Sequence, residues 1–270
     1  MPALPPRCSE RKTFLQTKND PMPVKAMILA AGTGTRLRPI TENRPKALVE
    51  INGKPLLEWV IRRLRKAGIR DMIVNVHHFP NQIRDFLERK EFFNLNIRIS
   101  DESSQLMDTG GALQKARACL DDGKPFLVHN VDILTDLDIP AFIAHHVEHR
   151  NAVSLAVRAR NTSRYLLFDS RNTLCGWENN KSGARILVGS RPAPVKKLAF
   201  SGIHIAGPEL FEYIPGKTPC PVIRAYLQMA EDHDIKGVEH NEGTWTDVGK
   251  IRDLKKGAEF VCNHPELFGI

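Results

Sequence analysis

The sequence has few cysteines, and they lie far apart. Its five cysteines are Cys8, Cys119, Cys175, Cys220 and Cys262, and no two of them form a CxxC pair. An odd number at such wide spacing indicates neither a zinc site nor a disulfide framework. This usage is typical of a reducing compartment, so we expect a cytoplasmic protein.

Long apolar runs are also missing. No stretch approaches the roughly 18–20 apolar residues that cross a membrane, and we expect no membrane partner. Residues 1–24 are polar, interrupted by proline and without periodicity, and they lack the apolar core of a signal peptide. We expect them to form a disordered extension, or to precede the true start, because Met22 or Met27 can initiate translation.

The net charge is +8, which raises the question of nucleic acid as a partner. The basic residues are scattered, however, and no aromatic residues interleave with a basic stripe. A site that binds several phosphates produces the same excess of positive charge. We therefore expect a phosphate-rich small molecule and no nucleic acid.

Two common phosphate-binding fingerprints are absent from the glycine-rich stretch AAGTGTRLRPITENRPK at 30–46. The dinucleotide pattern needs a third glycine where this chain has Leu37. The P-loop needs a Lys-Ser/Thr pair after its last glycine, and here Gly34 is followed by Thr35 and Arg36.

The same stretch nevertheless has the composition of a phosphate loop, and it follows an apolar strand. Gly32 and Gly34 let backbone N–H groups approach phosphate oxygens. Arg36 and Lys46 supply positive charge at the two ends. The alternative is a surface turn with solvated charges.

Strand-like and helix-like segments alternate through the first half of the chain. The predicted strands cover 25–31, 71–77, 97–102 and 125–132, and the predicted helices cover 55–68, 81–90 and 110–120. Such alternation predicts an α/β fold with a Rossmann-like, mostly parallel sheet flanked by helices. Ligands bind at the carboxyl ends of strands in such sheets.

After residue 150 the strands become short and alternating, which predicts an antiparallel, hairpin-rich region. These strands cover 152–159, 165–169, 173–177, 184–189 and 197–207; a helix at 220–233, a strand at 236–240, a turn at 243–249 and a helix at 251–262 follow. We expect one domain, 25–270, whose two halves are 25–150 and 151–270.

Two aspartates stand out as candidate metal ligands. Asp132 ends an apolar strand, where an unpaired carboxylate is costly. Asp247 lies in the glycine-bounded turn. Two carboxylates from separate segments suit Mg²⁺, but a turn or helix-capping role for Asp247 is an alternative.

In DTGGAL, 108–113, Asp108 or Thr109 can cap a helix, or the glycines can form a wall for a nucleobase.

The stretch MILAAGTGTRLRPITENRPKALVEINGKPLLEW matches G-x-G-T-R-x-x-P-x-T, then P-K, then G-K-P-L. DTGGAL, HNVD, FSGIHI and TWTDVGK follow in order. From about residue 25 to 262 the chain resembles the sugar-1-phosphate nucleotidyltransferases. It is most similar to the N-acetylmuramate-1-phosphate uridylyltransferase and mannose-1-phosphate guanylyltransferase types, with phosphocholine cytidylyltransferases as close relatives.

The resemblance implies a nucleotide-diphospho-sugar transferase fold, in which 25–150 is the nucleotide-binding half and 151–270 is the half that binds the sugar and supplies the second metal ligand. We expect a monomer or homodimer. The resemblance also implies an enzyme that joins a nucleoside triphosphate, UTP before GTP, to a sugar 1-phosphate with Mg²⁺. The implied catalytic residues are Arg36 at the pyrophosphate, Lys46 at the reacting phosphate, and Asp132; the implied nucleotide-binding residues are Ala30, Ala31, Gly32, Thr33, Gly34, Thr35, Thr109, Gly110, Gly111 and Asn130; the implied sugar-binding residues are Glu178, Lys197 and Gly202; the implied Mg²⁺ ligands are Asp132 and Asp247.

Two departures from the family pattern keep alternatives open. The family usually has glycine before the first metal aspartate, and this chain has Val131. Larger relatives carry a Glu-Lys pair whose lysine meets the sugar phosphate; here WENNK displaces it to Lys181, and Lys196 or Lys197 can replace it. The alternatives are a catalytically silent nucleotide-sugar sensor or regulatory subunit, and a phosphocholine-type cytidylyltransferase.

Overall fold

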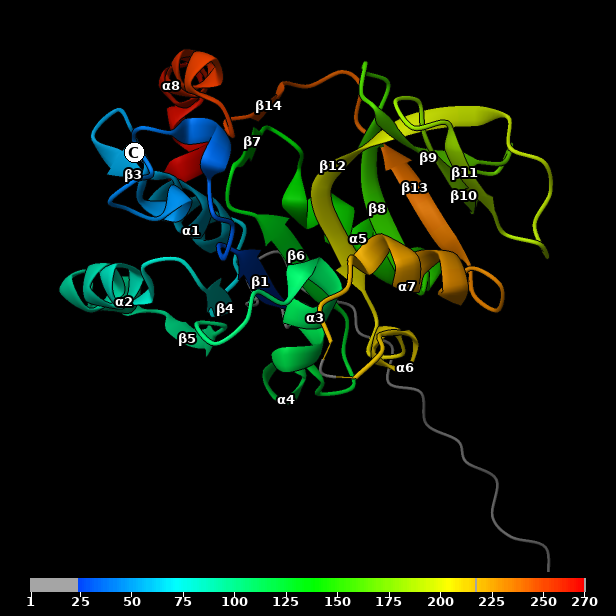
Figure 1. Ribbon diagram of the computed structural model, residues 1–270, viewed down its shortest axis with the longest axis horizontal. Coiled ribbons are helices and arrows are strands. Elements are labelled where there is room, and N and C mark those ends of the chain that lie inside the picture. Colours follow the sequence, from blue (N-terminus) through cyan, green and yellow to red (C-terminus); the bar gives the residue numbers. More distant parts are fainter. Residues whose placement is uncertain (1–23, 217, 270) are drawn as a thin grey trace, which may run out of the picture.

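The computed structural model describes residues 24–216 and 218–269. The extension expected at 1–24 lies outside these residues apart from Val24, which is buried. Over the described residues the chain builds one large sheet with helices on both faces (Figure 1).

Ten strands make up this sheet. They are β1 (Lys25–Leu29), β4 (Asp71–Val76), β5 (Asn96–Asp101), β6 (Phe126–Asn130), β8 (Val153–Arg158), β9 (Arg164–Phe168), β10 (Leu174–Asn179), β11 (Ala184–Leu187), β12 (Lys196–Ala206) and β13 (Ile235–Glu239). Two small pairs lie outside it: β2 (Glu50–Ile51) with β3 (Lys54–Pro55), and β7 (Ile133–Thr135) with β14 (Trp245–Asp247).

The helices are α1 (Leu56–Lys66), α2 (Pro80–Arg89), α3 (Asp108–Lys115), α4 (Arg117–Leu120), α5 (Ile139–His149), α6 (Leu210–Tyr213), α7 (Val222–Met229) and α8 (Ile251–Asn263). Short 3-10 turns are η1 (Thr35–Leu37), η2 (Lys46–Leu48), η3 (Glu91–Asn94) and η4 (Pro265–Phe268).

The sheet has a parallel and an antiparallel part, joined by β12. Strands β6, β1, β4 and β5 are neighbours in that order and run parallel. On the other side of β6, strand β12 runs antiparallel and pairs with both β8 and β9, and the hairpin strands β10 and β11 follow. The predicted fold class, a parallel α/β core with an antiparallel hairpin region, is confirmed.

The buried residues of β1 show how the sheet builds its two cores. Ala26 and Ile28 pack into a cluster with α1, α2, α5 and α8, whereas Met27 packs into a second cluster with α3, α4, α6 and α7. Successive strand residues point to opposite faces, so a continuous apolar strand is needed where both faces are covered. This explains why KAMILA has no polar residue after Lys25.

The predicted elements mostly form, with three corrections. The helix predicted over 110–120 is two helices that meet at Ala116. The helix predicted over 220–233 is shorter, because Pro221 precedes its first turn and the chain leaves the helix after Met229. The turn predicted over 243–249 contains strand β14, which pairs with β7. No helix among the described residues is long and apolar enough to cross a membrane.

Candidate active site

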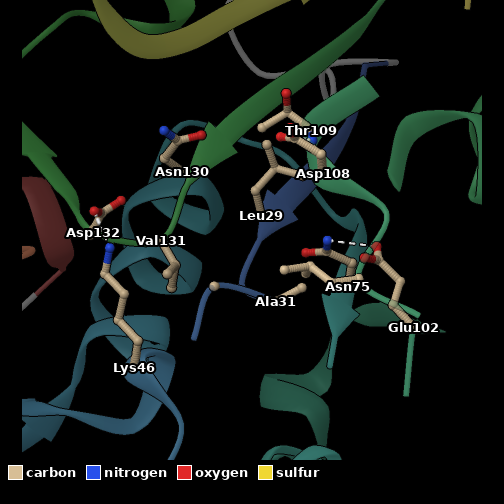
Figure 2. A pocket seen from close by; sticks show the side chains of 12 residues that line it. Leu29, Ala31, Lys46, Asn75, Glu102, Asp108, Thr109, Asn130, Val131 and Asp132 are labelled. Atoms are coloured by element: carbon tan, nitrogen blue, oxygen red, sulfur yellow. Dashed lines mark hydrogen bonds and ion pairs between the residues drawn. The ribbon is translucent and has the colours of Figure 1, made fainter. Parts of the chain in front are cut away.

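A cavity of about 360 Å³ opens where the parallel strands end (Figure 2). It is lined by Leu29, Ala31, Gly32, Lys46, Asn75, Glu102, Leu106, Asp108, Thr109, Asn130, Val131 and Asp132. Apart from Lys46, which begins η2, these residues lie at or after the carboxyl ends of β1, β4, β5 and β6, or near the start of α3. The position agrees with the rule that α/β sheets bind ligands beyond their strand carboxyl ends.

The glycine loop after β1 is tightly held at Gly34. Gly34 has a φ of +66°, and a Cβ there would lie 3.0 Å from side-chain carbons of both Lys46 and Thr41. Thr41 also donates its hydroxyl hydrogen to the Gly34 carbonyl at 2.8 Å. Gly32 is open by contrast, with only the Lys46 side chain within 4 Å of such a Cβ. The loop is thus fixed at one glycine and accessible to a ligand at the other.

Lys46 and Asp132 form an ion pair at one end of the cavity, as Figure 2 shows. Each side chain is only 12% exposed. Burial alone would raise the pKa of the Asp132 carboxyl, but the adjacent ammonium outweighs it and lowers this pKa below its usual value. Asp132 is therefore an ionised, largely dry carboxylate at neutral pH.

Asp247 reaches the same place from the far end of the chain. It ends β14 opposite Ile133, the residue after Asp132, and the Val248 N–H donates to the Asp132 carbonyl at 2.9 Å. Burial and the like charge of Asp132 raise the pKa of the Asp247 carboxyl. Arg36, at the end of the glycine loop, has an Nη 4.0 Å from Asp247 Oδ2.

Gly249 marks the point where these groups converge. A Cβ on Gly249 would lie 2.7 Å from Arg36 Nη2, 2.7 Å from Asp247 Oδ1 and 3.2 Å from Asp132 Oδ2. The two carboxylates predicted as metal ligands thus lie together, as the sequence expectation required. Asp247 reaches this place from strand β14, where the sequence predicted a turn.

This carboxylate pair has the chemistry to hold a divalent cation. No group of three or more His, Cys, Asp or Glu side chains suited to a metal occurs in residues 24–216 and 218–269. Mg²⁺, however, is commonly held by one or two carboxylates together with substrate phosphates. The like-charge repulsion that raises the Asp247 pKa is what a cation between the carboxylates would relieve.

The opposite end of the cavity contains a network that sequence analysis missed. Asn75 accepts a hydrogen bond from the Ala30 N–H at 2.7 Å and donates to Glu102 Oε1 at 2.8 Å. The other Glu102 oxygen accepts from the Met107 N–H at 3.1 Å. Glu102 is fully buried, and burial raises the pKa of its carboxyl. Glu102 ends a predicted strand, as Asp132 does, so the signal that selected Asp132 could also have selected Glu102.

The DTGGAL segment does not cap its own helix. Helix α3 has no side-chain cap, and the Thr109 hydroxyl instead accepts from the Val222 N–H at 2.9 Å. The Gly110 N–H donates to the Cys220 carbonyl at 2.8 Å. A Cβ on either glycine would meet a backbone carbonyl of the 218–220 segment at 3.0 Å. The capping interpretation is therefore wrong, and the base-wall interpretation stays a prediction.

The predicted nucleotide-binding residues divide into two sets. Ala31, Gly32, Thr109 and Asn130 line the cavity with Lys46 and Asp132, whereas Ala30, Thr33, Gly34, Thr35, Gly110 and Gly111 are not among the residues that line it. Val131 is also part of the cavity wall, and its side chain is 2% exposed. The residue that departs from the family pattern therefore lies against the space for the ligand.

The predicted sugar-binding residues lie in the antiparallel part of the sheet. Lys197 on β12 pairs with buried Glu178 on β10 at 2.6 Å. Lys196 instead binds Glu239 and Asn172, each at 2.9 Å. Of the two lysines, Lys197 is therefore the one that forms an ion pair with Glu178. Gly202, with a φ of +79°, contacts Asn130: a Cβ there would lie 2.9 Å from the Asn130 amide nitrogen.

The chain is similar to proteins of one family over most of its length. The model for the family described as nucleotidyl transferase matches residues 25–264. N-acetylmuramate alpha-1-phosphate uridylyltransferase of Neisseria meningitidis serogroup B is 33% identical over 240 residues, which are 86% of this chain and 96% of that protein. Mannose-1-phosphate guanyltransferase of Gibberella zeae is 31% identical over 241 residues, which are 87% of this chain and 63% of that protein.

A solved structure agrees with this assignment at the level of the fold. The UTP-bound UGPase from Acinetobacter baumannii superposes with a TM-score of 0.71 and 19% sequence identity, covering 92% of this chain and 96% of that one. The chain belongs to the nucleotidyl transferase family.

Proposed function

We propose that this protein transfers a nucleotidyl group from a nucleoside triphosphate to a sugar 1-phosphate and releases pyrophosphate. A phosphate oxygen of the sugar 1-phosphate forms a bond to the α-phosphorus, and the bond from that phosphorus to the oxygen of the pyrophosphate breaks. The observation that carries the proposal is the convergence of Lys46, Asp132, Asp247 and Arg36 at one end of the cavity.

The main obstacle to this reaction is electrostatic, because a dianion must approach a polyanion. Two like charges about 4 Å apart repel by roughly 4 kcal/mol at an effective dielectric of about 20. The nucleophile is already ionised, so no general base is needed. Lys46, which is 12% exposed, places a fixed positive charge beside the reacting phosphate without solvent reorganisation. Arg36 is 54% exposed and can follow the departing pyrophosphate.

Mg²⁺ is the proposed cofactor, held by Asp132 and Asp247. When bound, it neutralises phosphate charge and polarises the phosphoryl oxygens. The chain's own contribution is to keep both carboxylates in place. The β7–β14 pairing holds the two strands together, and the Gly249 N–H donates to Asp247 Oδ1 at 2.8 Å.

The nucleobase would occupy the end of the cavity formed by Asn75, Glu102, Asp108 and Thr109. The Asn75–Glu102 network fixes this wall, because each of its members accepts a backbone N–H. UTP is the favoured triphosphate, supported by the uridylyltransferase of Neisseria meningitidis, and GTP is next, supported by the guanyltransferase of Gibberella zeae. On the acceptor side we propose Glu178 and Lys197 as sugar-binding residues.

The proposal is tested by pyrophosphate release from the purified protein with Mg²⁺. Four nucleoside triphosphates are crossed with a panel of sugar 1-phosphates and phosphocholine, and Asp132→Asn serves as the blank. Release from one pair, lost in the variant, supports the enzyme and names both substrates. Release only with CTP and phosphocholine would mean that the acceptor is a choline phosphate and not a sugar phosphate. No pyrophosphate release from any pair, together with tight binding of a nucleotide-sugar, would favour a sensor on the same fold.

A further inference from the structure

One arginine outside the predicted site has no assigned role and an unusual environment. Arg160 lies in the loop between β8 and β9, and it is half-buried. Its guanidinium carbon lies 4.2 Å from the ring centroid of Trp245 on β14. One Nη donates a hydrogen bond to the Phe200 carbonyl at 2.9 Å. These two contacts fix the plane of the guanidinium.

Arg160 is a desolvated cation without a paired anion. Within the described residues no carboxylate lies within 4.0 Å of it, although ion pairs engage many other basic side chains. Burial lowers the pKa of Arg160, and the main opposing influence is the negative charge of Asp247. A half-buried guanidinium without a paired anion is costly, and an anion supplied from outside would offset that cost.

The guanidinium also lies where three hollows adjoin. The first, about 580 Å³, is lined by Asp247 and Thr246 in addition to Arg160. The second, about 540 Å³, is lined by Lys197 and Tyr165. The third, about 240 Å³, is lined by Trp177 and Phe200. Arg160 therefore lines one hollow with Asp247, a proposed metal ligand, and another with Lys197, a proposed sugar-binding residue.

We propose that Arg160 binds the phosphate group of the acceptor. This inference rests on the proposed function, and it adds a residue that the family resemblance does not supply. The lysines near the site are less suited to the task. Lys196 is engaged by Glu239 and Asn172, and the charge of Lys197 is partly offset by Glu178 at 2.6 Å. An oriented guanidinium offers paired N–H donors that match two phosphate oxygens.

The arrangement gives the two substrates separate cations. Lys46 lines the candidate nucleotide cavity together with Asp132, whereas Arg160 lines two other hollows, one with Thr246 and Asp247 and one with Lys197. Loss of Arg160 is therefore expected to affect the acceptor alone. Loss of Lys46 would affect the triphosphate reaction as a whole.

The test compares Arg160→Gln and Arg160→Lys with Arg171→Gln, which removes an exposed arginine from the β9–β10 turn. Steady-state kinetics use the triphosphate and sugar 1-phosphate identified by pyrophosphate release. We expect Arg160→Gln to raise the KM for the sugar 1-phosphate by about 10- to 100-fold and to leave the KM for the triphosphate unchanged. Arg160→Lys should recover part of the loss, and Arg171→Gln should match the unchanged protein.

Calorimetric titration with inorganic phosphate gives a readout that does not need turnover. Weaker phosphate binding by Arg160→Gln than by Arg171→Gln supports the site. Turnover with an unchanged acceptor KM in Arg160→Gln would overturn the inference and leave the proposed function intact. A rise in both KM values with unchanged phosphate affinity would also overturn it, because that pattern indicates a structural role. Absence of turnover in the unchanged protein would instead refute the proposed function, and phosphate affinity alone would then decide the role of Arg160.

Discussion

Lys46 and Asp132 form a buried ion pair although 86 positions separate them in the sequence. The pair connects the end of the glycine loop to the end of β6, so it joins the two segments that we propose hold the triphosphate between them. The ammonium also keeps Asp132 ionised in a place where burial disfavours its charge.

Replacing Lys46 by methionine keeps the length of the side chain and removes its charge. Because the ammonium is a preorganised cation in a poorly hydrated site, we expect kcat to fall by about 10²- to 10³-fold. The measurement is pyrophosphate release under saturating substrates. Lys66→Met, at the exposed end of α1, is the matched control. Retention of more than a tenth of the activity by Lys46→Met would contradict a catalytic role.

Asp247→Asn should change activity and stability in opposite directions. The pKa of Asp247 is raised in the folded protein, so its ionisation at neutral pH opposes folding, and this penalty grows as pH rises through the folded pKa. Asparagine removes the repulsion from Asp132. In chelator, we expect thermal denaturation of Asp247→Asn at pH 8 to occur at a higher temperature than in the unchanged protein, while activity with Mg²⁺ is lost. A lower melting temperature would show that the carboxylate has a stabilising partner.

The parts of the candidate site that the sequence placed at one edge of the sheet share a local signal. The glycine loop and Asp132 each follow an apolar strand, and strand ends in a parallel sheet meet at one edge. The position of Asp247 beside Asp132 could not be predicted in the same way, because it depends on the β7–β14 pairing, which has no local sequence signature. The role proposed for Arg160 is least predictable, since it rests on the Trp245 ring and on the lack of a counter-ion among the described residues, both set by the tertiary fold.

Val131→Gly tests whether the unusual residue before Asp132 limits the reaction. Val131 is 2% exposed and packs in the core cluster under the cavity. Loss of this side chain and the added freedom of glycine should lower the free energy of unfolding by about 3 kcal/mol. Denaturant unfolding measures that cost. If valine is merely a wall residue, triphosphate affinity should change less than about threefold, which is under about 0.7 kcal/mol.

A large gain of activity in Val131→Gly would lead to a different conclusion. It would mean that the valine holds the nucleotide away from Lys46 and Asp132, as a regulatory protein on this fold requires. Val128→Ala on β6, the strand that precedes Val131, is the control, because it removes buried apolar area that packs in the other core cluster.

Buried histidines should make the protein sensitive to mild acid. Burial lowers the pKa of His146 to about 4 and that of His204 to about 3. An unfolded imidazole titrates near 6.5, so between the two values the unfolded chain binds more protons and stability falls as pH falls. Each such histidine contributes a slope of about 1.4 kcal/mol per pH unit within that window.

His204→Phe isolates one of these contributions. His204 lies on β12 with its ring 5.5 Å from that of Tyr226, so phenylalanine preserves an aromatic contact of similar shape. Denaturant unfolding at pH 7 and pH 5 should show a smaller loss of stability in the variant than in the unchanged protein. His149→Phe, on the exposed side of α5, should leave the pH dependence as it was. Equal losses in all three proteins would place the acid sensitivity elsewhere.

Gly249→Ala probes the point where Arg36, Asp247 and Asp132 meet. The new methyl group would lie 2.7 Å from both Arg36 Nη2 and Asp247 Oδ1, so one of these side chains must move. Both ends are flexible and partly exposed, and Gly249 does not have a positive φ, so we expect the free energy of unfolding to change by less than about 0.5 kcal/mol. Activity should fall by about 100-fold, because a displacement of about 1 Å is enough to misplace reacting groups.

The control for Gly249→Ala is Gly189→Ala, since a Cβ at Gly189 meets nothing within 4 Å and its φ is not positive either. Both variants are compared by denaturant unfolding and by pyrophosphate release at several Mg²⁺ concentrations. Because the displaced groups include a proposed metal ligand, raising the Mg²⁺ concentration should recover part of the activity of Gly249→Ala. Full activity in this variant at low Mg²⁺ would mean that the close approach of Asp247 to Asp132 is not what the reaction requires.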